Sequence, residues 1–287
     1  MGNRPLDRLF LQYGVRGGKL LHISEVPSGL KCECVCSGCG DRLVAKKGRV
    51  RQHHFSHAAG SDCPTAVETA LHLAAKETLA KRKEIVLPRV GIRFRTYGSR
   101  RQIYSDIEEG PTSPDRVLAP EKRYILTSVA LEQRLGGIIP DVIAYVGERP
   151  LLIEIRVTHG IDDEKLEHIK RLDISTVEID LSGAPRDFLW KDLEELVVES
   201  GGHKRWAYNA FAEQERKRIV SQATNRPVFP IGSNLNFIRA GVKGCPRPRF
   251  NKPYWVNGKP FPTVEYDCWS CKHFLGFHEE DAVICDA

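Results

Sequence analysis

Short runs of alternating hydrophobic and polar residues open the 287-residue chain. Residues 9–13 and 19–23 both show this period of two, and Gly17 and Gly18 separate them, so the pattern predicts two short strands. From residue 65 to about Arg82 the apolar residues instead lie three and four positions apart, which is typical of a helix. The expected apolar stripe of that helix consists of Val67, Leu71, Ala74, Ala75 and Leu79.

The pattern from residue 84 to residue 200 predicts several strands and two helices. Strand-like runs cover 84–87, 92–94, 124–126, 141–146, 151–157 and 176–181, and a Pro- and Gly-rich loop at 110–114 interrupts them. Helices are expected at 162–171 and 187–199. This order predicts an α/β fold in which helices flank a mixed sheet.

The same pattern divides the chain into four expected parts. Residues 1–64 are a β-rich N-terminal module, and 65–200 are the α/β core. Gly201 and Gly202 mark a boundary, after which a polar helix over 205–223 belongs to a linker at 201–240. Residues 241–287 form a C-terminal cysteine module.

No apolar run approaches the roughly 18 residues that a membrane helix needs. The start of the chain has no apolar signal core, so we expect a cytosolic protein without a membrane partner. The net charge of +6 decides little, but between 81 and 101 eight basic residues stand against the single acid Glu84. Such a cluster suits a phosphate backbone, although a solvated surface is the alternative. The candidate nucleic-acid contacts are Arg93, Arg95, Arg100 and Arg101.

Nine cysteines form two groups, five between 32 and 63 and four between 245 and 285. In a reducing compartment, clustered cysteines indicate metal ligation rather than disulfides. In the first group Cys36 and Cys39 form a zinc knuckle, and Gly40 permits its tight turn. We expect the tetrahedral Zn²⁺ set Cys36, Cys39, His57 and Cys63, with His54 as the substitute ligand. Cys32 and Cys34 are expected to pack inside the module.

The second group predicts another four-cysteine metal site. One knuckle and two more distant cysteines supply four thiolates, which is the count of a structural zinc site. An iron–sulfur cluster uses the same ligands and is the alternative. The expected ligands are Cys245, Cys268, Cys271 and Cys285, and His278 is a candidate to replace one of them.

Two acidic residues on neighbouring predicted strands carry the candidate chemistry. Asp141 follows Pro140 at the start of one strand, and Glu154 interrupts an otherwise apolar strand. A carboxylate in such surroundings costs free energy unless it is paired or bound to a metal. A divalent cation between the two acids would remove their repulsion, and Mg²⁺ or Mn²⁺ prefers oxygen ligands. Glu68 shares one helical face with His72 and Lys76 and could complete the site.

At this point the sequence resembles a known family. The segments that carry the resemblance are Gly29-Leu30-Lys31-Cys32, Cys36-Ser37-Gly38-Cys39-Gly40, Leu43 to Gly48, His54-Phe55-Ser56-His57 and Glu68-Thr69-Ala70-Leu71-His72. They are similar to the competence CoiA-like nuclease family, and the similarity runs from about residue 8 to residue 182. It implies a zinc-binding front end before a restriction-endonuclease-like PD-(D/E)xK domain, and hydrolysis of DNA phosphodiester bonds. It also implies that Asp141, Glu154 and the backbone carbonyl of Ile155 hold Mg²⁺, with Glu68 in support.

One position departs from that family's pattern. The lysine expected two residues after Glu154 is Arg156, whose guanidinium is a poor proton acceptor. Lys165 in the following helix could reach the same cleft and orient the water or offset charge. Arg156 could instead clamp the phosphate.

We therefore expect a Mg²⁺-dependent nuclease that acts on nucleic acid, in the first place DNA. A non-catalytic nucleic-acid-binding module on a decayed nuclease fold is the alternative, motivated by Arg156, and a zinc-stabilised protein-interaction adaptor is a third. The oligomeric state stays open, with a homodimer among the options.

Overall fold

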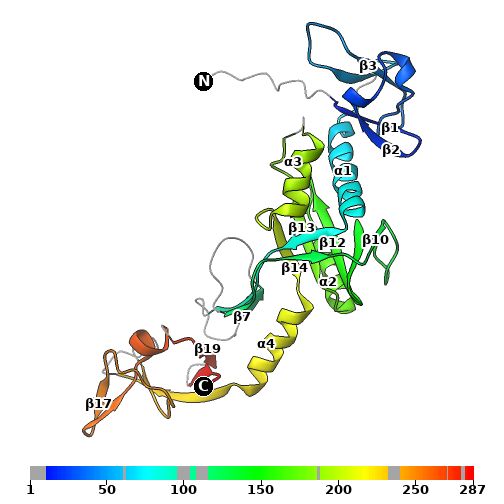
Figure 1. Cartoon of the computed structure of the whole chain (residues 1–287). Helices are drawn as coiled ribbons and strands as arrows, with labels where there is room; N and C mark the ends of the chain where they lie inside the picture. The colour runs from blue at the N-terminus through cyan, green and yellow to red at the C-terminus, as the bar shows by residue number, and fades with distance from the viewer. Residues whose placement is uncertain are drawn as a thin grey trace. The chain divides into compact units, whose positions relative to one another are not determined.

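The structure is a computed structural model that describes residues 11–60, 63–95, 104–107, 116–185, 188–231, 240–269, 271–278 and 282–287. It is a mixed α/β protein with several small sheets and one five-stranded mixed sheet (Figure 1). The chain divides into two compact units, of which the first comprises Met1–Pro88 and Glu121–Tyr208 and the second Arg89–Pro120 and Asn209–Ala287. This grouping places residues 89–120, which the sequence pattern assigned to the central core, with the C-terminal segment.

Two antiparallel strand pairs form the start of the first unit. β1 (Tyr13–Arg16) pairs with β2 (Lys19–His22), and β3 (Leu43–Lys46) pairs with β4 (His54–His57). Gly17 and Gly18 have positive φ angles of 58° and 76°, a conformation that favours glycine, and they make the predicted turn. The first strand is shifted from its predicted range of 9–13, of which residues 9 and 10 lie outside the described residues. The short helices η1 (Ile23–Glu25) and η2 (Leu30–Cys32) complete this module.

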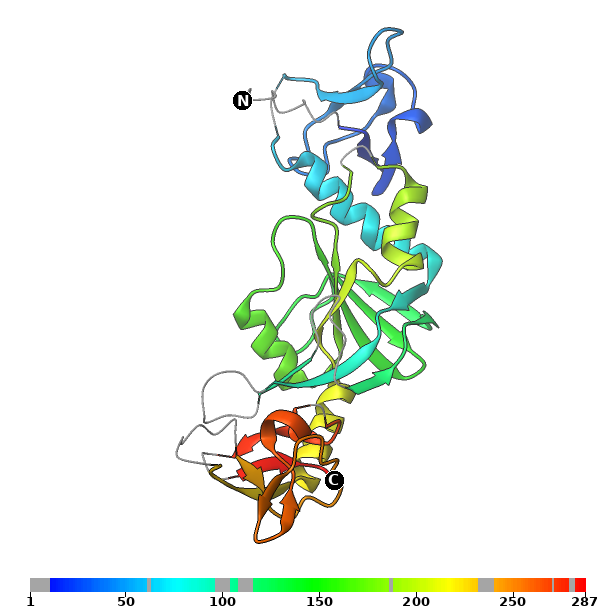
Figure 2. The same ribbon diagram turned by 90° about the vertical axis from the view of Figure 1, so that its left-hand side faces the viewer.

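The helix predicted from residue 65 is confirmed as α1 (Ala66–Arg82), which ends where Lys83 adopts a left-handed conformation. Ala70, Leu71, Ala74 and Leu79 are almost fully buried, as the apolar stripe predicts. The helix leads from the N-terminal strands to the large sheet, as both views show (Figure 2).

The five-stranded sheet has the order β10 (Ser128–Leu131), β11 (Val142–Val146), β12 (Arg149–Arg156), β13 (Thr176–Asp180) and β14 (Lys204–Tyr208). β12 and β13 are parallel and are joined through helix α2 (Asp163–Leu172), whereas the other neighbours are antiparallel. The strands predicted at 141–146, 151–157 and 176–181 and the mixed sheet are therefore confirmed. Helix α1 packs against β10 and β12, and α2 packs against β14.

The segment around residue 200 differs from the prediction. Helix α3 (Trp190–Glu194) continues as the π-helix η3 (Glu195–Glu199), within the predicted range of 187–199, whose first residue lies outside the described part. The helix predicted from Arg205 is wrong at its start, because residues 204–208 form the edge strand β14. There Trp206 and Tyr208 bury their apolar rings, and tertiary packing overrides the polar composition. A separate pair, β5 (Glu84–Leu87) and β9 (Lys122–Ile125), completes this unit.

The second unit contains one helix, α4 (Ala210–Gln222), and three small sheets in its described part. Strand β6 (Val90–Arg95) lies between β7 (Tyr104–Ile107) and β8 (Arg116–Ala119). A four-stranded sheet has the order β16 (Gly241–Val242), β15 (Thr224–Phe229), β20 (Ala282–Cys285) and β19 (Phe274–His278). The hairpin of β17 (Tyr254–Val256) and β18 (Lys259–Phe261) precedes the π-helix η5 (Val264–Cys268). The described part of the chain contains no helix that is both long and apolar enough to cross a membrane.

Candidate metal centre and acidic cavity

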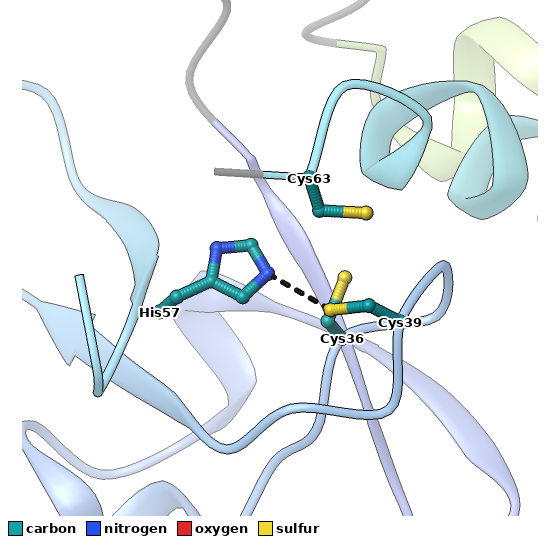
Figure 3. A group of neighbouring side chains, drawn as sticks. All are labelled: Cys36, Cys39, His57 and Cys63. Carbon is teal, nitrogen blue, oxygen red and sulfur yellow. Dashed lines mark hydrogen bonds between the residues drawn. The ribbon is translucent and has the colours of Figure 1, made fainter. Parts of the chain in front are cut away.

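The N-terminal module brings the four predicted zinc ligands together. The ligand atoms of Cys36, Cys39, His57 and Cys63 all lie within 4.8 Å of one another, which suits a single tetrahedral ion. Cys36 and Cys39 come from one loop, His57 from the end of β4, and Cys63 from the segment that leads into α1 (Figure 3). The Sγ of Cys39 lies 3.4 Å from Nε2 of His57. The structure thus confirms a Cys₃His cluster that could bind Zn²⁺.

Two glycines shape this cluster. Gly40 has a φ of 77°, and its N–H donates to the carbonyl of Cys36, which closes the knuckle turn. A Cβ on Gly38 would lie 2.9 Å from the Sγ of Cys63, so this position must lack a side chain. Burial raises the pKa of Cys36 to about 11, and a bound cation would reverse that effect by stabilising the thiolate.

Residues beside the cluster have other contacts. Nδ1 of His54 lies 2.9 Å from the carbonyl oxygen of Gln52, and this histidine is not part of the cluster. The buried thiols of Cys32 and Cys34 donate to the carbonyls of Leu43 and Cys32, so they pack in the core of the module as predicted.

In the central sheet the two predicted carboxylates lie on adjacent strands. Val142 of β11 is paired with Ile153 of β12, so extending this register by one pair sets Asp141 opposite Glu154. On the other side, Glu154 is paired with Glu178 of β13, and Glu178 with Arg205 of β14. Directly opposite residues project from the same face of a sheet. Three acids and one base therefore form a row across four strands.

A polar cavity of about 230 Å³ opens over this row. Three of the predicted site residues, Asp141, Glu154 and Lys165, contribute to its wall. The complete lining is His72, Asp141, Glu154, Ile155, Arg156, His159, Gly160, Ile161, Asp162, Lys165 and Glu178. The structure thus collects side chains from α1, α2 and three strands around one space.

Each of the two central carboxylates has one oxygen bound by the protein. Oδ2 of Asp141 accepts from Nε2 of His72 at 3.0 Å and from the N–H of Ile155 at 2.8 Å, whereas Oδ1 accepts no hydrogen bond from the described residues. Oε2 of Glu154 accepts from Nζ of Lys165 at 2.7 Å. Its Oε1 is buried and has no hydrogen-bond partner within the described chain. An unsatisfied buried oxygen is costly, and a cation would satisfy it.

The two acids differ in their pKa values. Burial raises the pKa of Asp141, but the hydrogen bonds from His72 and Ile155 outweigh this effect and hold the pKa below its usual value. Burial raises the pKa of Glu154 to about 7; the negative charge of Asp141 adds to the increase, and Lys165 opposes it. Opposite shifts on neighbouring carboxyls are typical of functional sites, although structural networks produce them too.

The two candidate cations have separate partners. Lys165 contacts Glu154, and its Nζ also donates to the carbonyl of Ile139 at 3.3 Å. Arg156 lies 3.0 Å from Asp180 and 3.7 Å from Glu178, so its guanidinium is engaged with acids of β13. Thus Lys165, not Arg156, contacts the predicted metal-binding carboxylate.

The α1 face predicted around Glu68 serves the cavity through a different residue. His72 lines the cavity and contacts Asp141, whereas Glu68, one turn earlier, is not among the lining residues. Lys76 is buried and pairs with Glu132.

Sequence reasoning missed Glu178, whose side chain is fully buried. It accepts hydrogen bonds from Arg205 at 3.0 Å and from the N–H of Ile161 at 3.0 Å. A Cβ on Gly160 would lie 2.9 Å from Oε2 of Glu178, so that loop can approach only as glycine. The signal was available, because Glu178 interrupts the apolar strand 176–181 in the way that Glu154 interrupts its own.

The remaining predicted residues lie in the second unit. Cys245, Cys268, Cys271 and Cys285 line one cavity, but no group among the described residues other than the Cys₃His cluster has three ligand atoms within 4.8 Å. Arg93 and Arg95 lie on β6, whose side chains at these positions are outside the described set. Arg100, Arg101 and the loop 110–114 lie outside the described residues. His278 is described only as part of β19.

Comparison with known proteins supports one segment. Residues 25–66 match the family model for the N-terminal domain of competence protein CoiA. This segment contains all four ligands of the Cys₃His cluster and stops at the start of α1. No curated protein and no solved structure gave a significant match to the chain. The resemblance expected over residues 8–182 is thus supported at its N-terminal end, and its nuclease part stays a prediction.

Proposed function

We propose that this protein is a Mg²⁺-dependent nuclease with a restriction-endonuclease-like PD-(D/E)xK core, and that it hydrolyses phosphodiester bonds of nucleic acid, in the first place DNA. The proposal rests on one observation, the cavity in which Asp141 and Glu154 each present one oxygen without a partner among the described residues. Mg²⁺, or Mn²⁺ in its place, takes oxygen ligands and is commonly held by one or two carboxylates, with water and substrate phosphate in its other positions.

The chemistry of the donor set fits such an ion. Both free oxygens belong to carboxylates, and the hydrogen bonds on Oδ2 of Asp141 fix the orientation of that side chain. The cavity has room for the ion, its waters and a phosphate oxygen. Glu68 takes no part in this set, and its place on α1 is taken by His72, which orients Asp141 without being a ligand itself.

When bound, Mg²⁺ would supply a Lewis acid and an activated water. The protein's own residues do the rest. Asp141 and Glu154 hold the ion, and His72 keeps Asp141 in place. Lys165 is the cation beside Glu154, where it orients the attacking water or offsets the charge that develops on the phosphate. Arg156 neutralises Glu178 and Asp180 at the edge of the same cavity.

The Cys₃His cluster has a structural role in this proposal. A closed set of four protein ligands has no open position for substrate, which is typical of structural Zn²⁺. It fixes the loop of Cys36 to the start of α1, the helix that delivers His72 to the cavity. The zinc module would therefore support the position of the helix that orients Asp141.

Cleavage of labelled single-stranded, duplex and branched DNA tests the proposal, with Mg²⁺, with Mn²⁺ and without divalent cation. We expect cleavage only with a divalent cation and none by Asp141→Asn. Glu164→Gln is the matched control, because Glu164 is exposed on α2 and does not line the cavity. Binding of DNA without any cleavage in Mg²⁺ or Mn²⁺ would overturn the nuclease and favour the non-catalytic binding module.

The role of Lys165 has its own test. Lys165→Ala should lower the cleavage rate by about two to three orders of magnitude, the usual cost of removing one such electrostatic group, while DNA binding persists. Lys170→Ala on the same helix is the control, since Lys170 pairs with Glu167 outside the cavity. Wild-type cleavage by Lys165→Ala, together with an inert Arg156→Ala, would return the lysine's role to Arg156.

A further inference from the structure

The second unit has a cavity with a different chemistry. All four cysteines of the C-terminal group line it: Cys245, Cys268, Cys271 and Cys285. They come from separate points of the chain, namely the turn after β16, the end of η5, the turn before β19 and the last residue of β20. Clustered thiols from distant points of one fold, unpaired with one another, are the donor set of a thiophilic metal.

The packing around this cavity supplies a reason for a metal. The apolar cluster here consists of only four small buried residues, Ala240, Val242, Val264 and Val283. Val228, Cys268 and Phe274 pack against it while partly exposed. So small a core buries little apolar surface, and small folds of this kind usually need a metal or disulfides to stay folded.

The size of the cavity distinguishes between the two metal centres that use four thiolates. Its volume is about 30 Å³, which is close to the share of liquid volume that one water molecule occupies. That space accommodates a single ion and is too small for a cluster of several iron and sulfide atoms. Zinc is the ion that four thiolates hold as a closed structural site.

A histidine beside the thiols completes the argument. His273 lines the cavity, and its Nε2 is buried without a hydrogen-bond partner in the described part of the chain. Its Nδ1 lies 3.1 Å from Oδ1 of Asp286, and Oδ2 of Asp286 pairs with Arg116 on β8. A carboxylate that fixes one ring nitrogen while the other faces the ligands is a frequent arrangement around metal sites.

We propose that this cavity binds one structural Zn²⁺ through Cys245, Cys268, Cys271 and Cys285, with His273 facing the thiolates and held in place by Asp286. The ion draws the four sulfurs together and fixes η5, the turn before β19 and the end of β20 to one another. The proposal is independent of the nuclease activity, because every residue in it belongs to the second unit.

Metal analysis of the purified full-length chain tests the proposal. The wild type should hold about two equivalents of zinc, one for each cysteine site, and Cys268→Ser/Cys271→Ser should hold about one. Cys34→Ala, a buried thiol outside both sites, is the control and should keep both ions. His273→Ala should weaken retention of the second zinc by roughly 10- to 100-fold. Unchanged zinc in the double variant overturns the proposal, and so does iron with acid-labile sulfide in the wild type.

A measurement on the wild type covers the case in which the double variant does not fold. Alkylation with iodoacetamide under native conditions, followed by mass spectrometry, reports each cysteine separately. The four cysteines should react slowly, and a zinc chelator should accelerate all of them together. Equal alkylation rates with and without chelator would overturn the site.

Discussion

Replacing Glu154 by glutamine should remove a pH dependence of stability that the buried carboxyl imposes. Glu154 is only 6% exposed, and burial beside Asp141 raises its pKa from 4.5 to about 7. Between these two pH values the unfolded chain releases a proton that the folded chain retains. The free energy of unfolding therefore falls as the pH rises from about 4.5 to about 7 and levels off above it. The gap between the two pKa values corresponds to about 3 kcal/mol.

Urea unfolding of wild type and Glu154→Gln from pH 5 to pH 8 measures this difference. The buffers should lack Mg²⁺ and also lack chelator, because a chelator would strip zinc from the cysteine sites. Other titrating groups, such as Lys204, whose pKa burial lowers to about 8, affect both proteins alike and cancel in the comparison. Most of the expected fall lies within this pH range, so the wild type should lose up to about 3 kcal/mol more than the variant.

Addition of Mg²⁺ at pH 8 extends the test. The wild type should gain roughly 2.7 kcal/mol at a hundredfold excess over the dissociation constant, and Glu154→Gln should gain much less. Parallel stability curves of the two proteins from pH 5 to pH 8 would refute the reasoning, because they would show that Glu154 titrates as an exposed acid. A pH difference without any Mg²⁺ effect, even with DNA present, would leave the buried acid and remove the metal.

Three further predictions concern the zinc module and the basic segment. His57→Ala should lower zinc affinity by more than about a hundredfold, the upper end for residues that only orient a ligand, whereas His54→Ala should keep the wild-type affinity in a competition titration. Gly38→Ala should lower the melting temperature and weaken zinc retention because its Cβ would meet Cys63, whereas Gly48→Ala, with no heavy atom within 4 Å of its Cβ, should do neither. Neutralising Arg93, Arg95, Arg100 and Arg101 together should flatten the salt dependence of DNA binding by close to one log–log unit for each phosphate that an arginine no longer neutralises, and an unchanged slope would assign them to solvated surface.

The zinc module and α1 were predictable because their signals are local. The Cys36–Cys39 knuckle has fixed ligand spacing, and the surplus of nearby donors left few choices for the second pair. The helix from residue 66 to Arg82 follows from apolar spacing that does not depend on the rest of the fold. The choice of His57 over His54 needed the strand, because alternate residues of β4 point to opposite faces and its end adjoins the loop of Cys36.

The edge strand β14 was not predictable from composition. Residues 205–208 follow two glycines and continue into a polar segment, so local propensity favoured one helix from Arg205 onward. Pairing with β13 decides otherwise, since it buries Trp206 and supplies Arg205 as the partner of Glu178. Long-range pairing of this kind leaves no periodic signal within the segment itself.

The acidic cavity was predictable in its residue types and not in its partners. A charged residue inside an apolar strand pointed to Glu154, and Pro140 pointed to Asp141. Their alignment with Glu178 depends on the register of three strands, which the sequence does not specify. His72 likewise came into contact with Asp141 through the packing of α1 on β12, although Glu68 had the residue type that the sequence argument preferred.

The register also explains why an arginine stands two residues after Glu154. Side chains two apart on a strand share a face, so Arg156 lies beside Glu154 and directly opposite Asp180 of β13. Strand β13 thus places two acids, Glu178 and Asp180, next to a pair of carboxylates that already repel each other. A planar guanidinium can engage both, whereas a lysine ammonium is a compact point charge suited to one. With Glu178 and Asp180 neutralised by Arg156 and Arg205, Asp141 and Glu154 are the acids of this row that keep oxygens available for a metal. The ammonium group then has to come from another element, and Lys165 on α2 contacts Glu154 from there.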